Sequence, residues 1–414
     1  MYDLNLSADQ LEIRETVRRF ATQEIKPVVL HPDRLQRPDR VLPLEILDQA
    51  SQMGLRTLAL SEALGGAGAD NLTCCLAMEE LAAGDVDIAA TLGHTSMLGH
   101  ILFDQLLTPG QRARFLPQFL ADDRYHLASA AYSPESELGW KYHRSYQDKT
   151  VCGVSAVRRD GEWVVNGMTS FVANAPVAKL FAVDVRTDPG AAGKNGVSAL
   201  LIPRDTKGLT VQEPQQSGGG SHSQGEPFVR WFHGTGGQLV FKDCRVAAEN
   251  LLGKEGASPL DGVVMGRGTP QVQAMNVGIG RAAYEAAVEY AKLRVQGARR
   301  IIEHQAIGSK LAEAAIKLEV ARSMVWRAAW AADHPDAYAS LSELPLQTIA
   351  KVFTSQVVYE VTEDAAECFG GMGVMLDMPL PKYIHDARIF LHSGDSNSVA
   401  KLRIAEALAG FQRT

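Results

Sequence analysis

The sequence predicts an α+β fold in which a run of β-strands lies between two helical parts. Helical spacing of apolar residues dominates the first and last thirds of the 414-residue chain, whereas short segments rich in valine and alanine follow one another in the middle. Because no helical segment separates these strands, we expect an antiparallel sheet or barrel and not a nucleotide-binding βαβ fold. The expected domains are residues 1–126, 127–248 and 249–414.

The first third is predicted to be a set of helices. Ser7 and Gln10 have the spacing of a capping box, in which each side chain bonds the backbone of the other. Pro27 is predicted to mark the end of the helix that follows, since proline disrupts a helix interior. Further helices are predicted at residues 44–53, 72–83, 89–107 and 109–120.

The middle third contains the predicted strands. They cover residues 150–157, 162–166, 180–185, 197–202, 209–212, 228–232 and 238–241. Asp160-Gly161 between two of them is a hairpin signal. The final third returns to helical spacing at residues 307–330 and 346–368, with a break at residues 333–336 and an end at the glycine-rich residues 369–373.

Composition excludes several classes of function. A formal net charge of −7 argues against nucleic-acid binding, which needs clustered basic side chains. The first residues have neither a basic region nor an apolar run, and no stretch reaches the ~20 apolar residues that span a bilayer, so we expect no leader and no membrane segment. Five cysteines without a repeated CxxC spacing indicate reduced thiols and a cytoplasmic protein, and no metal is expected.

Two segments of the last third resemble a known family. Residues 290–307 are similar to the start of a C-terminal helix in acyl-CoA dehydrogenases, and residues 367–373, followed by residues 380–388, resemble the glycine turn and the stretch before the active-site loop of that family. The resemblance covers nearly the whole chain. It implies an acyl-CoA dehydrogenase-like fold with a C-terminal four-helix bundle and FAD as cofactor. The chain would be a divergent member of the family.

The resemblance implies that FAD is bound by two subunits. Arg294 matches the arginine that reaches the FAD pyrophosphate of the neighbouring subunit, and its fork of donors suits phosphate oxygens. The glycine turn would let the backbone approach the adenosine part of the cofactor. The residues expected to bind FAD are Arg294, Gln296, Gly370, Gly371, Gly373, Ser133, Phe171, Ala173, Ser396 and Asn397.

The middle of the chain carries a weaker part of the resemblance. Residues 163–175 are similar to the segment that covers one face of the flavin, but Phe171, Val172 and Ala173 stand where the family usually has Trp-Ile-Thr. An aromatic ring can still stack on the isoalloxazine, whereas the hydroxyl is lost at Ala173. The family's upstream flavin motif is eroded at residues 132–136, and an insertion follows through residue 146.

The position of the family's catalytic glutamate holds no carboxylate. In the family a glutamate takes the α-proton of an acyl thioester, while the β-hydrogen leaves as hydride to flavin N5. Counting from residues 386–388 places Gly394 at that glutamate, with Asp395 and Ser396 after it.

Three interpretations of the missing glutamate stay open. In the first, Asp395 is the base on a loop shifted by one residue, and it is the catalytic candidate. In the second, the base comes from elsewhere. Asp261 lies near the segment that faces the substrate in relatives, but nothing selects it, and Arg267 and Thr269 in that segment are not carboxylates. In the third, the site abstracts no α-proton.

The first functional hypothesis is therefore an FAD-dependent oxidoreductase that introduces a double bond into an acyl group on CoA or on a carrier protein. Its expected partners are an electron-transfer flavoprotein or another acceptor, in a homotetramer or heterotetramer. The alternatives are a non-redox flavoprotein lyase similar to a desulfinase, a cofactor-poor subunit of a heteromeric acyl-CoA dehydrogenase, and a helical scaffold without a ligand.

Overall fold

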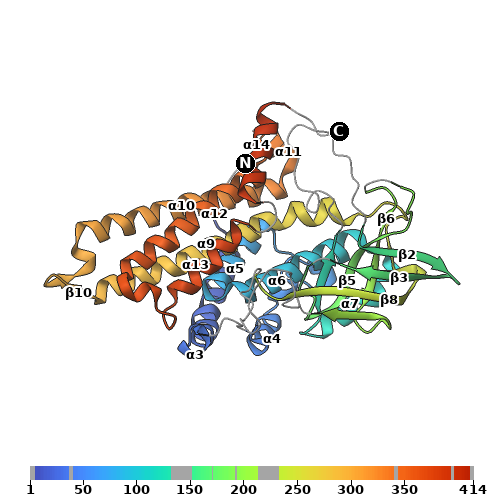
Figure 1. Cartoon of the computed structure of the whole chain (residues 1–414), viewed down its shortest axis with the longest axis horizontal. Helices are drawn as coiled ribbons and strands as arrows, with labels where there is room; N and C mark the ends of the chain where they lie inside the picture. Colours follow the sequence, from blue (N-terminus) through green and yellow to red (C-terminus); the bar gives the residue numbers. More distant parts are fainter. Residues whose placement is uncertain are drawn as a thin grey trace, which may run out of the picture.

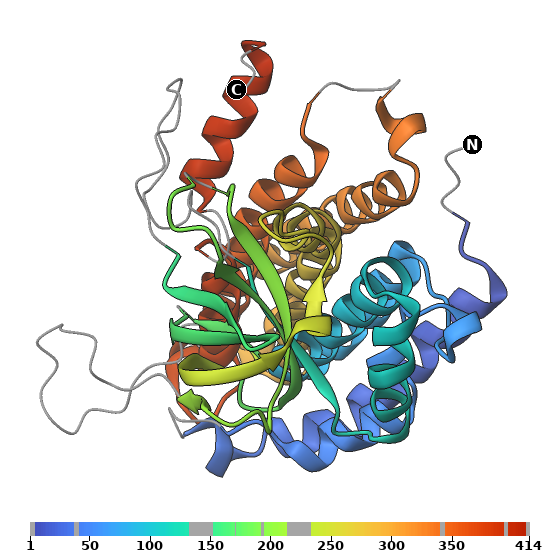
Figure 2. The same cartoon turned by 90° about the vertical axis from the view of Figure 1, so that its right-hand side faces the viewer.

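The computed structural model has a helical bundle at one end and a β-sheet at the other (Figure 1). It describes residues 5–36, 41–131, 152–169, 171–191, 194–212, 233–339, 344–392 and 396–410, and for residues 261–269 it describes the backbone alone. Figure 2 looks from the side of the sheet and shows the N-terminal helices, in blue, beside the sheet and the orange and red helices of the bundle behind it. The predicted order of helices, sheet and helices is confirmed.

The N-terminal helices lie close to the predicted segments, except that the one predicted at residues 89–107 is α-helical only to Gly99 and continues as a π-helical stretch, His100–Leu106. They are α1 (Ala8–Phe20), α2 (Lys26–Val29), α3 (Pro32–Leu35), α4 (Leu44–Gln52), α5 (Asn71–Gly84), α6 (Val86–Gly99) and α7 (Pro109–Ala121). The capping box is confirmed, because Ser7 N–H donates to Gln10 Oε1 at 3.0 Å and Gln10 N–H donates to Ser7 Oγ at 3.1 Å. Two hydrogen bonds thus satisfy donors that the first turn of α1 would otherwise leave free.

The prediction that the first helix ends at Pro27 is wrong. A π-helical turn, Ala21–Ile25, continues directly from α1 and leads into α2. Pro27 lies in the first turn of α2, where a residue needs no N–H for an intrahelical hydrogen bond, so the ring is tolerated. The helical path therefore runs on to Val29.

The middle of the chain forms a nine-stranded sheet. The strands are β1 (His126–Ala130), β2 (Val154–Arg159), β3 (Glu162–Met168), β4 (Val172–Ala173), β5 (Ala178–Arg186), β6 (Val197–Pro203), β7 (Leu209–Gln212), β8 (Gly236–Ala247) and β9 (Leu251–Leu252). The hairpin at Asp160-Gly161 is confirmed: Arg159 pairs with Glu162, and both turn residues have positive φ, as a type I′ turn requires. The strand predicted at residues 228–232 lies outside the described residues.

The antiparallel prediction holds for most of the ladders, with β5 as the exception. β5 pairs with β6 in antiparallel fashion, but β1 lies parallel to it over five positions and β2 at one position. Because β1 enters the sheet from the N-terminal helices and not through a hairpin, no tight turn forces it to run antiparallel.

The C-terminal part is a helical bundle, as the resemblance implies. Its helices are α9 (Leu260–Leu293), α10 (Gln305–Asp333), α11 (Pro335–Ala339), α12 (Leu346–Phe369), α13 (Leu380–Phe390) and α14 (Asn397–Leu408), and the short hairpin of β10 (Val295–Gln296) and β11 (Arg299–Arg300) joins α9 to α10. A Cβ at Gly280 of α9 would lie 2.8 Å from Leu318 of α10 and 3.0 Å from Val358 of α12, so glycine permits this close packing. Within the described part of the chain, no helix is long and apolar enough to cross a membrane.

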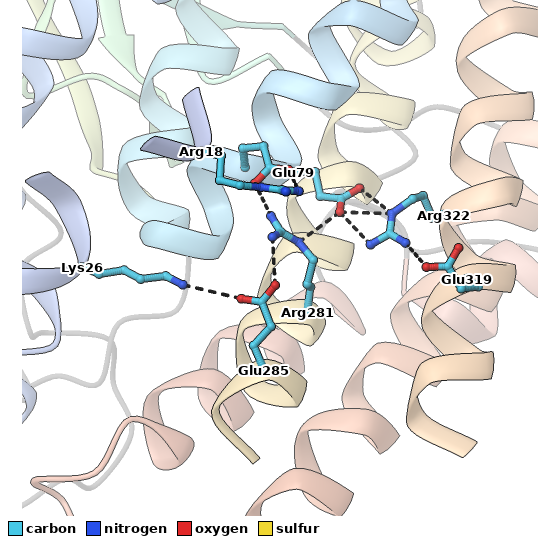
Figure 3. A network of polar contacts seen from close by, with 8 residues as sticks. Arg18, Lys26, Glu79, Arg281, Glu285, Glu319 and Arg322 are labelled. Carbon is cyan, nitrogen blue, oxygen red and sulfur yellow. Dashed lines mark hydrogen bonds and ion pairs between the residues drawn. The ribbon is translucent and has the colours of Figure 1, made fainter. Parts of the chain in front are cut away.

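A buried network of charges joins the N-terminal helices to the bundle (Figure 3). Arg281 of α9, whose side chain is 12% exposed, lies between Glu79 (3.2 Å) and Glu80 (2.5 Å) of α5. Glu80 also pairs with Arg18 of α1 at 2.8 Å, and Glu79 pairs with Arg322 of α10 at 2.9 Å. Four helices from both ends of the sequence thus share one set of ion pairs. Glu285, Glu319 and Lys26 extend the set outward.

We expect Arg281→Met to lower the free energy of unfolding by about 3 kcal/mol, because two buried glutamates then lose a counter-charge. Urea unfolding of the variant and the wild type at equal protein concentration measures this difference. The matched control is Lys292→Met, which removes one partner of an exposed pair with Glu289 and should cost less than about 1 kcal/mol. Equal losses in the two variants would contradict a structural role for the network.

Candidate functional site

A cavity of about 240 Å³ lies where the N-terminal helices, the sheet and the bundle meet. α6 contributes Ala90, Gly93, His94 and Met97, the β4 region contributes Phe171, Ala173 and Asn174, α9 contributes Gln271, Val272 and Met275, and α13 contributes Ile389 and Phe390, with His233 completing the wall. Most of these side chains are apolar, as in binding sites for organic ligands, where a few polar groups fix the orientation.

Two of the predicted cofactor residues, Phe171 and Ala173, lie on this cavity. Ala173 of β4 pairs with Gly236 of β8 in an antiparallel ladder. A Cβ at Gly236 would lie 2.0 Å from the Phe171 ring, so the ring occupies the space that the missing side chain leaves. The sheet edge therefore presents an aromatic ring and a small residue at the cavity, and their contact with a flat ring system stays a prediction.

Asn174 fixes the end of β4 to α6. Its backbone has a φ of 63°, in the left-handed region that asparagine tolerates better than most residues. Its side-chain amide donates to Thr91 O at 2.9 Å and to Thr95 Oγ1 at 3.2 Å, both on α6. Asn174 lies in the segment 163–175 but was given no role from the sequence, although an asparagine directly after a short strand is a turn signal.

A buried ion cluster fixes α13 to the start of α6. The Lys382 ammonium, whose side chain is 4% exposed, lies 2.5 Å from Asp386 Oδ2 and 3.4 Å from Asp85 Oδ2. Asp85 caps α6 by accepting from the N–H groups of Asp87 and Ile88. α13, which carries Phe390, is thereby held against α6, whose side chains form one wall of the cavity.

His233 and Gly234 are fixed to the same two helices. The Nε2–H of His233 donates to Asp386 O at 2.9 Å, so the proton of the neutral ring is on Nε2. Its ring packs on Phe390 with centroids 4.4 Å apart. Gly234 N–H donates to Asp87 Oδ1 at 2.7 Å. Together with the hydrogen bonds of Asn174, these contacts fix the end of β4, α6 and α13 in their positions around the cavity.

Three histidines in and beside this region are held neutral. Burial lowers the pKa of His94, His126 and His233 to about 4. His126, which is 2% exposed, lies with Nδ1 3.1 Å from Thr95 Oγ1. His94 borders the cavity, and its enclosed Nε2 has no hydrogen-bond partner among the described residues.

The other group of predicted cofactor residues lies at the end of the bundle that is remote from the sheet (Figure 1). Arg294 ends α9, Gln296 is in β10, and both are exposed. The side chain of Arg294 forms no hydrogen bond or ion pair with the described residues. Tyr290 stacks on Phe369 at 4.1 Å, which brings the glycine turn after α12 to the same end of the bundle.

The three predicted glycines of this turn have different roles inside the chain. Gly370 has a φ of 58°, so it needs the conformational freedom of glycine to end α12. A Cβ at Gly373 would lie 2.3 Å from Ala366 O, so packing within the chain explains that glycine. A Cβ at Gly371 would meet nothing within 4 Å, and this open backbone is the part of the turn that an outside group can approach.

Two further candidates lie at the start of α14, where their side chains are already engaged. Ser396 caps the helix by accepting from Val399 N–H at 3.4 Å. Asn397 Oδ1 accepts from Lys351 Nζ at 2.6 Å and from Ser355 Oγ at 3.0 Å. A cofactor contact from these two residues would have to use their backbone or share these bonds.

The remaining candidates are not described by the structure. Ser133 and the catalytic candidate Asp395 lie outside the described residues, and nothing is described of the side chains of Asp261, Arg267 and Thr269. The residues that are described lie in three places: the sheet edge, the end of the bundle remote from the sheet, and the start of α14.

Comparison with known proteins identifies the same family in all three parts of the chain. Family models described as "Acyl-CoA dehydrogenase" match as the N-terminal domain over residues 7–123, the middle domain over residues 148–230 and the C-terminal domain over residues 263–409. A protein of Bacillus subtilis strain 168 named acyl-CoA dehydrogenase is 29% identical over 416 residues, covering 98% of this chain and 100% of the relative.

Two solved structures have the same fold as this chain. The butyryl-CoA dehydrogenase from Megasphaera elsdenii is 27% identical with a TM-score of 0.82, and the match covers 99% of this chain and 100% of that one. The structure of PigA with FAD and proline is 25% identical with a TM-score of 0.80, and the match covers 99% of each chain.

We expect the free energy of unfolding to fall as the pH is lowered from about 6.5 to about 4, partly because the unfolded chain binds protons that the buried histidines exclude. Each such histidine contributes up to about 1.4 kcal/mol per pH unit in this window. His126→Asn should therefore flatten the pH dependence measured by urea unfolding between pH 7 and pH 4.5. His31→Asn, at an exposed histidine, is the control and should leave the slope unchanged. An unchanged slope in His126→Asn would contradict a buried neutral imidazole.

Proposed function

Because this chain belongs to the acyl-CoA dehydrogenase family, we propose that it is an FAD-dependent oxidoreductase that introduces a double bond into an acyl thioester. The observation that carries the proposal is the cavity between α6, β4, α9 and α13, with Phe171 and Ala173 on its wall. It is mostly apolar, and it joins all three parts of the chain that match the family. An apolar site of this kind suits both a flavin ring and a hydrocarbon chain.

The described residues suit FAD when two copies of the chain are considered together. Phe171 and Ala173 of one copy would cover the flavin ring, while Arg294, Gln296 and Gly371 of a neighbour would hold the pyrophosphate and adenosine parts. The guanidinium of Arg294, which has no partner among the described residues, and the open backbone at Gly371 support this division. FAD, when bound, supplies the acceptor for the hydride that leaves the β-carbon. We further propose a tetramer and an electron-transfer flavoprotein, or a similar acceptor, as partner.

The proton of the α-carbon requires a base from this chain, and we propose Asp395. Its segment follows α13 directly, and Phe390 at the end of that helix lines the cavity. The Lys382–Asp386 pair and the His233 hydrogen bond hold α13 in place, and with it the point in the chain from which this segment starts. A carboxylate positioned near the α-carbon would raise the rate of proton removal by about 10²–10⁴-fold.

The purified protein should bind FAD, and a suitable acyl-CoA should bleach the flavin absorbance under anaerobic conditions. Bound FAD that no acyl-CoA in a wide panel bleaches would instead favour a non-redox lyase. FAD uptake only after co-expression with a second chain would favour a subunit of a heteromeric enzyme. A protein that takes up no flavin in either preparation would contradict the proposal.

We expect Arg294→Ala to weaken FAD binding by about 10–100-fold, because a charge-assisted hydrogen bond to phosphate is lost. The apparent dissociation constant from flavin fluorescence titration measures the change. Arg159→Ala, at the exposed tip of the β2–β3 hairpin, removes the same charge away from the proposed site and should leave the affinity unchanged. Equal affinities in the two variants would remove Arg294 from the cofactor site.

With a substrate that reduces the wild-type flavin, Asp395→Asn should slow the reduction by about 10²–10⁴-fold while FAD remains bound. Stopped-flow absorbance in the absence of oxygen gives the rate. Asp377→Asn, at an exposed aspartate before α13, is the matched control and should react at the wild-type rate. A wild-type rate in Asp395→Asn would exclude Asp395 as the base.

A further inference from the structure

His94 is a polar side chain in a largely apolar wall. It lies on α6 between Gly93 and the turn that carries Met97, and both of these residues also line the cavity. A Cβ at Gly93 would lie 2.6 Å from Met275 of α9, so the two helices are in close contact beside the histidine. Met275 and Phe390 contribute further apolar surface to the same cavity.

The imidazole of His94 has hydrogen-bonding capacity that the described residues do not use. Its Nε2 is enclosed by the protein and has no partner among the described residues, so a ligand cannot reach that nitrogen. Nδ1 also forms no hydrogen bond within the described part of the chain, but it is not enclosed, and it is the nitrogen that a molecule in the cavity can reach. The other polar groups at this cavity are different, because the Asn174 amide donates to Thr91 and Thr95 and His233 donates to Asp386 O. Buried polar groups are nearly always hydrogen-bonded in folded proteins, so an unpaired ring at a cavity wall indicates a partner supplied by a ligand.

The protonation state of His94 limits the chemistry of that partner. Because burial lowers the pKa of His94 to about 4, the ring is neutral at pH 7 and offers one donor and one acceptor. A neutral ring has no charge with which to attract a carboxylate, and a base this weak removes an α-proton poorly. A hydroxyl or carbonyl oxygen is the group that such a ring binds well.

We propose that His94 is a specificity-determining residue that selects an acyl group carrying an uncharged oxygen, as a hydroxyl or keto group, over a plain hydrocarbon chain. The inference rests on the proposed function, in which the acyl part of a thioester lies in the cavity beside the flavin ring that Phe171 and Ala173 cover. A hydrocarbon chain in this cavity would cover Nδ1 and leave it unpaired, whereas an oxygen on the chain would give Nδ1 a hydrogen-bond partner. Sites of this kind reject analogues that lack the hydrogen-bonding group.

Calorimetric titration of the FAD-loaded protein tests the proposal without relying on turnover. The probes are hexanoyl-CoA, its singly hydroxylated and keto analogues, and adipoyl-CoA, which carries a terminal carboxylate. Wild type should bind at least one hydroxy or keto analogue about tenfold more tightly than hexanoyl-CoA, equivalent to about 1.4 kcal/mol. Tightest binding of hexanoyl-CoA or of adipoyl-CoA would overturn the proposal.

Variants at His94 assign the preference to this side chain. In His94→Leu the preference should disappear, and in His94→Gln, which keeps a donor and an acceptor, part of it should remain. His31→Leu, at an exposed histidine, should keep the full preference. A preference that survives in His94→Leu would overturn the proposal.

Thermal unfolding without ligand gives a second measure that does not depend on acyl-CoA binding. His94→Leu removes an unpaired buried polar group, so its melting temperature should equal or exceed that of wild type. A lower melting temperature would indicate that the imidazole already has a partner inside the protein, and this result would overturn the proposal.

The two proposals fail in different ways. If no acyl-CoA of the panel binds, both the proposed function and the role of His94 are wrong. If hexanoyl-CoA and its oxygenated analogues bind equally and bleach the flavin, the proposed function stands and the role of His94 is wrong.

Discussion

The structure depends on the burial of Arg281 between Glu79 and Glu80. An unpaired charge in this position would be very costly, so the three side chains can be buried only when α5 and α9 are in register. α5 and α9 also approach so closely that a Cβ at Gly278 would lie 2.3 Å from Glu79 O. The ion pairs of Arg281 and the small residue Gly278 therefore specify the same packing of α5 against α9. The helices α1 and α10 are attached to this pair through Arg18 and Arg322.

The position of α5 determines the position of the cavity. Asp85 ends α5, caps α6 and faces the ammonium of Lys382 on α13. The Asp85 carboxylate thus links the packed pair of α5 and α9 to α6 and α13, which form walls of the cavity. Asn174 links the sheet edge to α6 in the same way. The histidines in this region lie among these packed elements, where loss of solvation favours the neutral imidazole.

Much of the fold was predictable because its signals are local. The capping box at Ser7 and the type I′ hairpin at Asp160-Gly161 depend only on residues close in sequence. Pro27 was misread because a π-helical turn places it in the first turn of a new helix, and the sequence has no marker for that turn. The parallel pairing of β1 with β5 was missed because it joins strands that are far apart along the chain.

The candidate site was predictable only in part, for a related reason. Arg294 and the glycine turn stand out because a short string of residues carries the resemblance to the family. No short segment of sequence marks the buried charges, since Glu79 and Arg281 are about 200 residues apart. Each of them alone looks like a residue on an exposed helix face. His94 is likewise ordinary in sequence. Its significance depends on the cavity that four distant segments form around it.

The separation of Phe171 from Arg294 along the length of the molecule has a genetic consequence. If each FAD site uses the sheet edge of one copy and the bundle end of another, damage at the two places affects different halves of a site. A copy defective at Phe171 could then restore a copy defective at Arg294, because some mixed pairs would contain one site with both halves intact. Two inactive alleles of this gene would complement each other, whereas two alleles damaged in the same half would not.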